Sequence, residues 1–279
     1  MSLLLVVASG LLHAVWSLFA KVSRNKSVFL WLIMAVATLV LLPVLVRELW
    51  VTPLPPEAYG FLLLSACLQG GYALLLARTY QMGDLSQVYP IMRGTSTLLI
   101  PLCSVLFLQE SLSPFGWTGL AAMIAGFLGL SGFAGRSPAP GAVKPFLLAL
   151  SVGVCTTCYV LVDRINLGYL SPLSLLEVTN LGFTAALTPI ALRSKQLKEE
   201  WKAHAKLIVL GSVLNPGSYL LFLFALQLAP VAHISPVREI GTVFATILGI
   251  VVLKEKQGRV RILCSALILS GLLLIGFLG

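Results

Sequence analysis

Charged side chains are scarce in this sequence: they make up 10% of its 279 residues, whereas hydrophobic side chains make up 58%. A soluble domain usually has about 25% charged residues, which cover its surface. This chain has too few of them to cover a surface in water, so lipid must cover most of it. The composition therefore excludes a water-soluble protein and predicts an all-α integral membrane protein.

Motifs of catalysis and metal binding are missing as well. The sequence contains no GxSxG, no HExxH and no P-loop. Cys155 and Cys158 form a CxxC pattern, which could be redox-active or bind a metal, but no second pair of ligands accompanies it. We expect these cysteines to be packing residues of an apolar helix. The sequence therefore predicts no enzymatic activity, no cofactor and no metal site.

A cleavable signal is not indicated either. The first apolar run has no positive side chain before it, and Lys21, Arg24 and Lys26 follow it. A secretory signal has the reverse arrangement. We therefore expect this run to be retained as the first membrane helix.

The apolar runs are long enough to cross a bilayer, for which a helix needs roughly 20 residues. Divided at charges, glycines and prolines, the sequence predicts ten spans, at residues 2–20, 28–47, 59–78, 86–108, 115–133, 145–163, 172–192, 206–227, 232–253 and 260–278. A Pro- and Gly-containing segment near the midpoint is typical of a linker. We expect a five-helix repeat at 1–135, a linker at 136–144 and a second repeat at 145–279.

Lysine and arginine are unevenly distributed over the predicted loops. Loops alternate between the two sides of the membrane, and one side receives nearly all of these cations, which identifies it as cytoplasmic. Both termini are then expected outside the cytoplasm. Because the net charge of +9 is spread over short loops, we do not expect nucleic-acid binding. The predicted cytoplasmic loops are 21–27, 79–85, 134–144, 193–205 and 254–259.

One membrane segment occurs twice. Residues 88–110 read VYPIMRGTSTLLIPLCSVLFLQE, and residues 233–255 read HISPVREIGTVFATILGIVVLKE, so that Arg93 falls on Arg238. Each half has five spans, and an odd number inverts the second copy relative to the first. The sequence therefore predicts two inverted five-helix repeats, an architecture of many secondary carriers.

Arg93 and Arg238 are the leading binding candidates, because an ionisable side chain within a span is a functional hypothesis by default. A guanidinium binds a carboxylate or phosphate through two parallel hydrogen bonds. The alternative is an ion pair that fixes helix positions. We expect Arg238 to form such a pair, with Glu239 or Glu177. Arg93 has no acidic neighbour earlier in its own span than Glu110, so we expect it to hold the substrate's anionic group.

The surroundings of Arg93 carry a further expectation. Pro90 and Pro101 lie on either side of it, and proline removes a helical hydrogen bond. The helix is therefore expected to be bent or locally unwound near Arg93.

Other polar and aromatic residues are candidates for a substrate cavity. Glu177 and Glu239 could bind a substrate amine or carry a coupling proton, and His13 could relay protons. Aromatic residues of membrane helices also serve in packing or at the interface, and both interpretations stay open. The remaining candidates for the cavity wall are Trp16, Tyr72, Tyr89, Tyr159, Asn180 and Tyr219.

The chain resembles the EamA family of the drug/metabolite transporter superfamily. Both halves carry its loose pattern of an apolar helix ending in glutamate, a short turn and a small-residue helix with a late glycine. The two copies read IPLCSVLFLQESLSPFGWTGLAAMIAG and ATILGIVVLKEKQGRVRILCSALILSG, and the start GLLHAVWSLFAK resembles the family's first helix. The resemblance implies ten helices around a central cavity and proton-coupled or exchange transport.

These observations lead to one expected function and two alternatives. We expect a secondary active transporter that moves a small polar metabolite with an anionic group, an amino acid or similar zwitterion, across the inner (plasma) membrane by alternating access. Its partners would be the substrate, the lipid bilayer and protons as the coupling ion, and the chain would be a monomer or homodimer. The alternatives are an exporter of cationic or lipophilic drugs and a non-transporting membrane scaffold.

Overall fold

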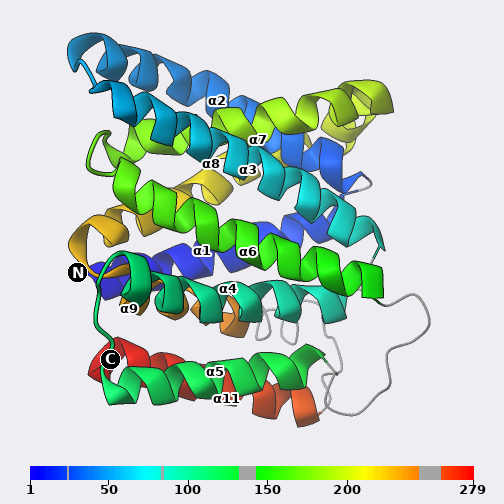
Figure 1. Ribbon diagram of the computed structural model, residues 1–279. Coiled ribbons are helices and arrows are strands. Elements are labelled where there is room, and N and C mark those ends of the chain that lie inside the picture. Colours follow the sequence, from blue (N-terminus) through cyan, green and yellow to red (C-terminus); the bar gives the residue numbers. More distant parts are fainter. Residues whose placement is uncertain (24, 83–84, 132–142, 245–258) are drawn as a thin grey trace.

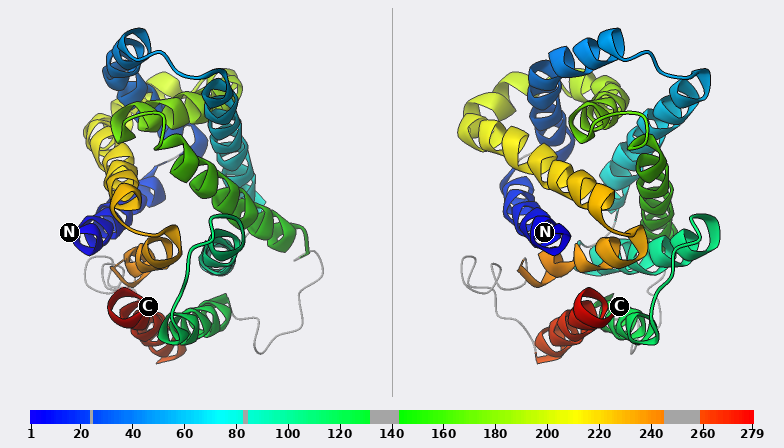
Figure 2. Two further views of the ribbon diagram at one scale, coloured as in Figure 1. Left: turned by 60° about the vertical axis from the view of Figure 1, so that its left-hand side comes forward. Right: turned by 90° about the vertical axis from the view of Figure 1, so that its left-hand side faces the viewer.

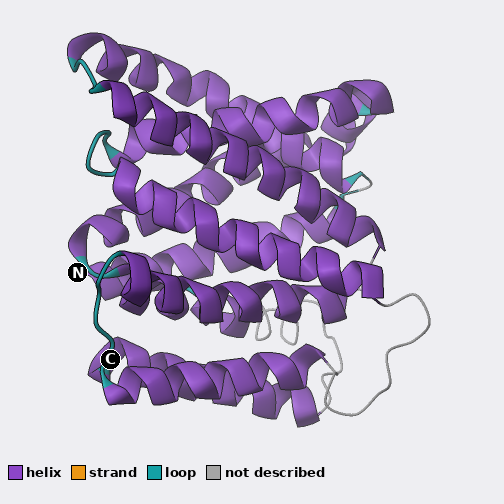
Figure 3. Cartoon of the chain, in the orientation of Figure 1, coloured by secondary structure: helices purple, strands orange, loops and turns teal. Residues whose placement is uncertain are grey.

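A computed structural model describes residues 1–23, 25–82, 85–131, 143–244 and 259–279, and every regular element in these ranges is a helix (Figures 1 and 3). The prediction of an all-α chain is therefore confirmed for the described residues. The helices are α1 (Ser2–Val22), α2 (Lys26–Val51), α3 (Pro56–Met82), α4 (Leu85–Phe107), α5 (Pro114–Ser131), α6 (Val143–Asn166), α7 (Pro172–Ser194), α8 (Leu197–Leu228), α9 (Val231–Val237) and α11 (Arg259–Leu278).

Seven helices among the described residues, α2 to α8, are long and apolar enough to cross a membrane. Shorter apolar stretches lie in α1 at residues 2–16 and in α11 at residues 262–278. The chain is thus a multi-pass membrane protein, while the number of ten spans stays a prediction. Of the predicted linker, residues 136–142 lie outside the described residues, as does Glu255.

Two helices differ from the expected course. Although Pro90 and Pro101 lie within α4, the helix continues through both, so the expected local unwinding at Arg93 is wrong, while the expected bend stays a prediction. The ninth predicted span is interrupted instead: α9 ends at Val237, Arg238 and Glu239 form a turn, and helix resumes at residue 240. Pro236 contributes to this break because it has no N–H to donate within the helix.

The helices run side by side, and the C-terminal ends of α1, α3, α5 and α7 lie at one end of the bundle (Figure 1). The two chain termini lie together at the opposite end, which faces the viewer in the right-hand view of Figure 2. We call the end with the C-terminal ends of these helices the loop end, and the end with the two chain termini the terminal end. Helices of the two halves contact one another extensively, in the pairs α1–α8, α2–α7, α2–α8, α3–α6, α3–α7, α4–α6, α4–α9, α1–α9 and α5–α11.

Small residues permit the closest of these approaches. A Cβ added to Gly119 of α5 would lie 2.6 Å from the carbonyl oxygen of Gly271 in α11. One added to Gly126 would lie 2.8 Å from the carbonyl oxygen of Cys264. Helices in lipid associate through such close backbone contact, since burial of apolar surface gives them little gain there.

Two carboxylates of the first half cap helices of the second half at the terminal end. Glu110 accepts hydrogen bonds from the backbone N–H groups of Val231 at 2.9 Å and Ala232 at 2.8 Å, in the first turn of α9. Glu48 accepts from the backbone N–H of Ser171 at 2.7 Å and from the hydroxyl of Ser174 at 2.5 Å, at the start of α7. Each carboxylate satisfies donors that a helix start leaves unpaired.

Candidate functional site

A central cavity of about 70 Å³ lies among the helices of both halves. It brings together predicted residues that are far apart in the sequence. The candidates among its lining residues are His13, Trp16, Tyr72, Arg93, Tyr159, Asn180, Tyr219 and Arg238. The amide side chains of Gln69 and Asn215 also line it, and the sequence interpretation missed both as site residues.

Arg93 reaches the cavity from α4 and is paired. Its guanidinium lies 3.3 Å from a carboxylate oxygen of Glu239, and both side chains are mostly buried. It also contacts the ring nitrogen Nε2 of His13, and it lies over the ring of Tyr89, 5.3 Å from the ring centre. His13 is held by Trp16, whose indole N–H donates to Nδ1 at 3.3 Å. Arg93 therefore has an acidic partner from another segment of the chain, which is the ion-pair alternative named above.

Arg238 lies in the break after α9, where the helix tightens. Three backbone hydrogen bonds join residues three apart: Glu239 to Pro236 at 3.0 Å, Gly241 to Arg238 at 3.2 Å, and Thr242 to Glu239 at 2.8 Å. This is the 3₁₀ pattern, which in the middle of a helix often accompanies function. Gly241 permits the break to pass close to α1, since a Cβ there would lie 2.8 Å from the carbonyl oxygen of Gly10.

The guanidinium of Arg238 is held by aromatic rings and a hydroxyl. It lies 5.3 Å from the ring centre of Tyr219 and 4.4 Å from that of Phe222, and its Nε donates to the hydroxyl of Ser9 at 3.2 Å. Among the described residues, no carboxylate lies within ion-pair distance of it. The expected pairing is therefore reversed: Glu239 binds Arg93 and not Arg238. Glu239 directly follows Arg238, and side chains of adjacent residues in a helical turn do not face each other.

Asp163 of α6 forms a buried cluster beside Arg238. Its carboxylate accepts a hydrogen bond from the hydroxyl of Tyr219 at 2.5 Å and another from Ser65 of α3. Its side chain is fully buried, although residue 163 is the last one of the predicted span 145–163. Tyr159, one turn earlier on α6, packs edge-on against Tyr219, with ring centres 6.0 Å apart. The cluster thereby fixes the ring on which Arg238 rests.

The three remaining candidates do not line the cavity themselves. Glu239 and Tyr89 contact Arg93, which itself lines the cavity. Glu177 of α7 is fully buried and accepts a hydrogen bond from the amide of Asn180 at 3.4 Å. Asn180, but not Glu177, reaches the cavity wall.

A model of the EamA-like transporter family matches residues 1–132 and 143–277. The chain belongs to this family. An uncharacterized transporter in the cobO 3' region of Sinorhizobium sp is 32% identical to this EamA chain over 131 residues, which are 45% of this chain and 92% of that relative. The EamA chain is thus a membrane transporter of the drug/metabolite transporter superfamily.

A solved crystal structure, described only as that of a protein, has a TM-score of 0.77 to this EamA chain. The match covers 99% of this chain and 96% of the other, at 19% sequence identity. At that identity, the likeness shows a common fold and nothing about the substrate.

Proposed function

We propose that this EamA-family chain is a secondary active transporter for a small polar metabolite with an anionic group, such as an amino acid or similar zwitterion. It carries this substrate across the inner (plasma) membrane by alternating access. The observation that supports the proposal is Arg238, a cation in the wall of the central cavity with no carboxylate partner among the described residues.

The surroundings of Arg238 support an anion as its ligand. A charge removed from water is costly unless it is paired. An aromatic ring stabilises a guanidinium less than a carboxylate partner stabilises it. A substrate carboxylate at Arg238 would supply the missing charge through charge-assisted hydrogen bonds. The amides of Gln69, Asn180 and Asn215 would then contact the polar remainder of the substrate.

The same geometry argues against export of cationic drugs. That function would need an acidic side chain in the cavity wall. Glu239 is already bound to Arg93, and Glu177 is not among the lining residues. Both arginines, in contrast, line the cavity, so its charged side chains favour anions.

Alternating access requires the cavity to change size. Its volume is about 70 Å³ in this structure. We expect the cavity to widen when a metabolite with an anionic group binds.

An inverted repeat would supply the two stages, and the helix packing supports it. If α1 to α5 are exchanged in order with α6, α7, α8, α9 and α11, then α1–α8 becomes α6–α3, α3–α7 becomes α8–α2, and α4–α6 becomes α9–α1. The pairs α2–α7 and α5–α11 map onto themselves. All of these pairs are in contact, as expected for two inverted copies related by a twofold axis.

The loop end is proposed to face the cytoplasm. The motivation is the excess of lysine and arginine in the loops assigned to this side. We expect a reporter that works only outside the cytoplasm to be active when it is fused after Gly279. Activity of a cytoplasmic reporter at that position instead would reverse the orientation.

A ligand screen tests the transport proposal. Purified protein is heated with a panel of amino acids, phosphonates, organic cations and neutral sugars, and the unfolding temperature is recorded. A solute that binds only the folded state stabilises it by about 2.7 kcal/mol at roughly 100 times its Kd. We expect stabilisation by an anionic or zwitterionic solute and saturable uptake of that solute into liposomes. Stabilisation by organic cations alone would contradict the proposal.

A further inference from the structure

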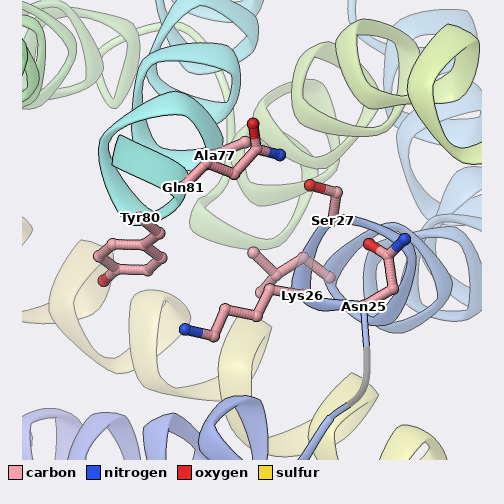
Figure 4. Close-up of a pocket in the computed structure, with 7 residues that line it drawn as sticks. Asn25, Lys26, Ser27, Ala77, Tyr80 and Gln81 are labelled. Atoms are coloured by element: carbon pink, nitrogen blue, oxygen red, sulfur yellow. The ribbon is translucent and has the colours of Figure 1, made fainter. Parts of the chain in front are cut away.

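A second cavity, of about 220 Å³, lies at the loop end between the start of α2 and the last turns of α3 (Figure 4). Its polar wall consists of Asn25, Ser27 and Gln81 together with Lys26 and Tyr80. Figure 4 shows the side chain of Lys26 extending toward Tyr80, and its ammonium lies 5.8 Å from the centre of that ring. We call this cavity the vestibule.

The vestibule and the central cavity share one residue. Leu30 lines both of them, and its side chain is only 4% exposed. On α3, Ala77 lines the vestibule and the preceding residue, Leu76, lines the central cavity. Leu30 therefore borders both spaces, and Leu76 and Ala77 place them next to each other along α3.

The charge of the vestibule has one sign. Lys26 is the charged residue in its wall, and none of the described carboxylates lies within ion-pair distance of its ammonium. A charge at the mouth of a cleft acts over several ångströms, because the surrounding protein limits screening by water. At about 6 Å and an effective dielectric constant between roughly 20 and 80, it enriches a monovalent anion about 3- to 100-fold.

We propose that the vestibule is an anion-collecting site on the substrate's route, where Lys26 draws in a small organic anion before it passes Leu30 to Arg238. This inference rests on the proposed function, since it concerns the same anionic substrate. It adds a second binding site and a direction of access from the loop end. The route also assigns a role to Leu30, as the barrier between the two sites.

Thiol labelling tests the vestibule without any knowledge of the substrate. The five native cysteines are replaced by serine or alanine, and Gln81→Cys places one thiol in the vestibule wall. The probes are a negatively charged sulfonatoethyl and a positively charged trimethylammonioethyl methanethiosulfonate, and their rates are normalised to a free thiol in solution. We expect the anionic reagent to be favoured several-fold at this position. Lys26→Gln should abolish that preference, and Lys26→Arg should keep it.

A matched thiol at the other end of the molecule provides the control. Thr52 is exposed at the terminal end, so Thr52→Cys should label with a charge preference that Lys26→Gln leaves unchanged. The inference is overturned if the preference at position 81 survives Lys26→Gln, or if the change at position 52 is equally large. Gel filtration of each variant confirms that the compared proteins are folded.

A thiol in the central cavity tests the route. Thr179 lines that cavity, so Thr179→Cys reports on reagent that has passed the barrier. Leu30→Ala should speed its labelling by the anionic reagent, and Leu30→Trp should slow it, while labelling at position 81 is unaffected by Leu30→Ala. Equal rates in all three backgrounds would overturn the route. Because labelling requires no transport, these results are independent of whether the ligand screen supports the proposed function.

Discussion

Arg93 and Arg238 occupy the same position in the repeated segment, yet their surroundings differ. Arg93 lies on an uninterrupted helix and is paired with Glu239 at 3.3 Å. Arg238 lies in a break between helices and rests on the rings of Tyr219 and Phe222. Equivalent positions of the repeated segment thus hold one cation paired with a carboxylate and one cation that rests on aromatic rings.

The position of one acidic residue, Glu239, determines which of the two arginines is ion-paired. Glu239 follows Arg238 directly in the sequence, but its carboxylate points across to α4 and neutralises Arg93. Position 94, which follows Arg93, is a glycine and offers no equivalent side chain. This one residue therefore accounts for the difference in ion pairing, and substitutions around it should separate the two arginines.

The largest effect is expected from breaking the ion pair. Glu239→Gln leaves the guanidinium of Arg93 buried without a countercharge, which should lower the free energy of unfolding by about 3–5 kcal/mol. The measurement is chemical denaturation of the purified protein in detergent. In the double variant Arg93→Met/Glu239→Met, no charge is left unpaired, so most of this loss should be recovered. A Glu239→Gln protein as stable as the wild type would show that the pair contributes little.

A smaller effect, on binding instead of stability, is expected at Arg238. Arg238→Lys keeps a charge but loses the planar pair of donors, so the affinity for the best solute of the ligand screen should fall by about 1.5–3 kcal/mol, or roughly 10- to 100-fold. Isothermal titration calorimetry measures this change. Arg93→Lys is the matched control, since it keeps the contact with Glu239 and should lose less. If Arg238→Lys and Arg238→Ala are folded and bind normally, Arg238 is not the anion anchor.

The smallest effect is expected from the hydroxyl that orients Arg238. Ser9→Ala removes the acceptor of its Nε hydrogen bond, and one such bond contributes about 0.5–1.5 kcal/mol, or roughly 2- to 12-fold in affinity. Ser151→Ala on α6 is a suitable control, because that hydroxyl is exposed and bonds only within its own helix. Equal affinities of the two variants would exclude a positioning role for Ser9.

The sequence predicted the helices and eight of the 17 residues that line the cavity. Long apolar runs specify membrane helices almost by themselves, and the duplicated segment drew attention to both arginines. Tyr72, Tyr159 and Tyr219 were found because polar aromatic residues stand out in apolar helices. All three line the cavity.

The pairing of the charges and the cluster at Asp163 could not be predicted in the same way. Both depend on how helices from different halves approach one another. The periodicity of residues along one helix carries no information about that approach. A signal for Asp163 did exist: it follows Tyr159 by four residues and therefore shares its face of α6. The turn at Arg238 had a weaker signal, since Pro236 resembles the prolines of α4, which interrupt nothing.

The caps formed by Glu48 and Glu110 have a mechanical consequence. In each cap the carboxylate belongs to one half of the chain and the helix start belongs to the other, so both act as latches across the terminal end. Any rocking of the halves that parts this end must release several charge-assisted hydrogen bonds together, each contributing about 1.5–3 kcal/mol. In the proposed alternating access, opening at the terminal end would therefore cost the free energy of these hydrogen bonds, and a bound substrate would have to offset that cost before release on that side.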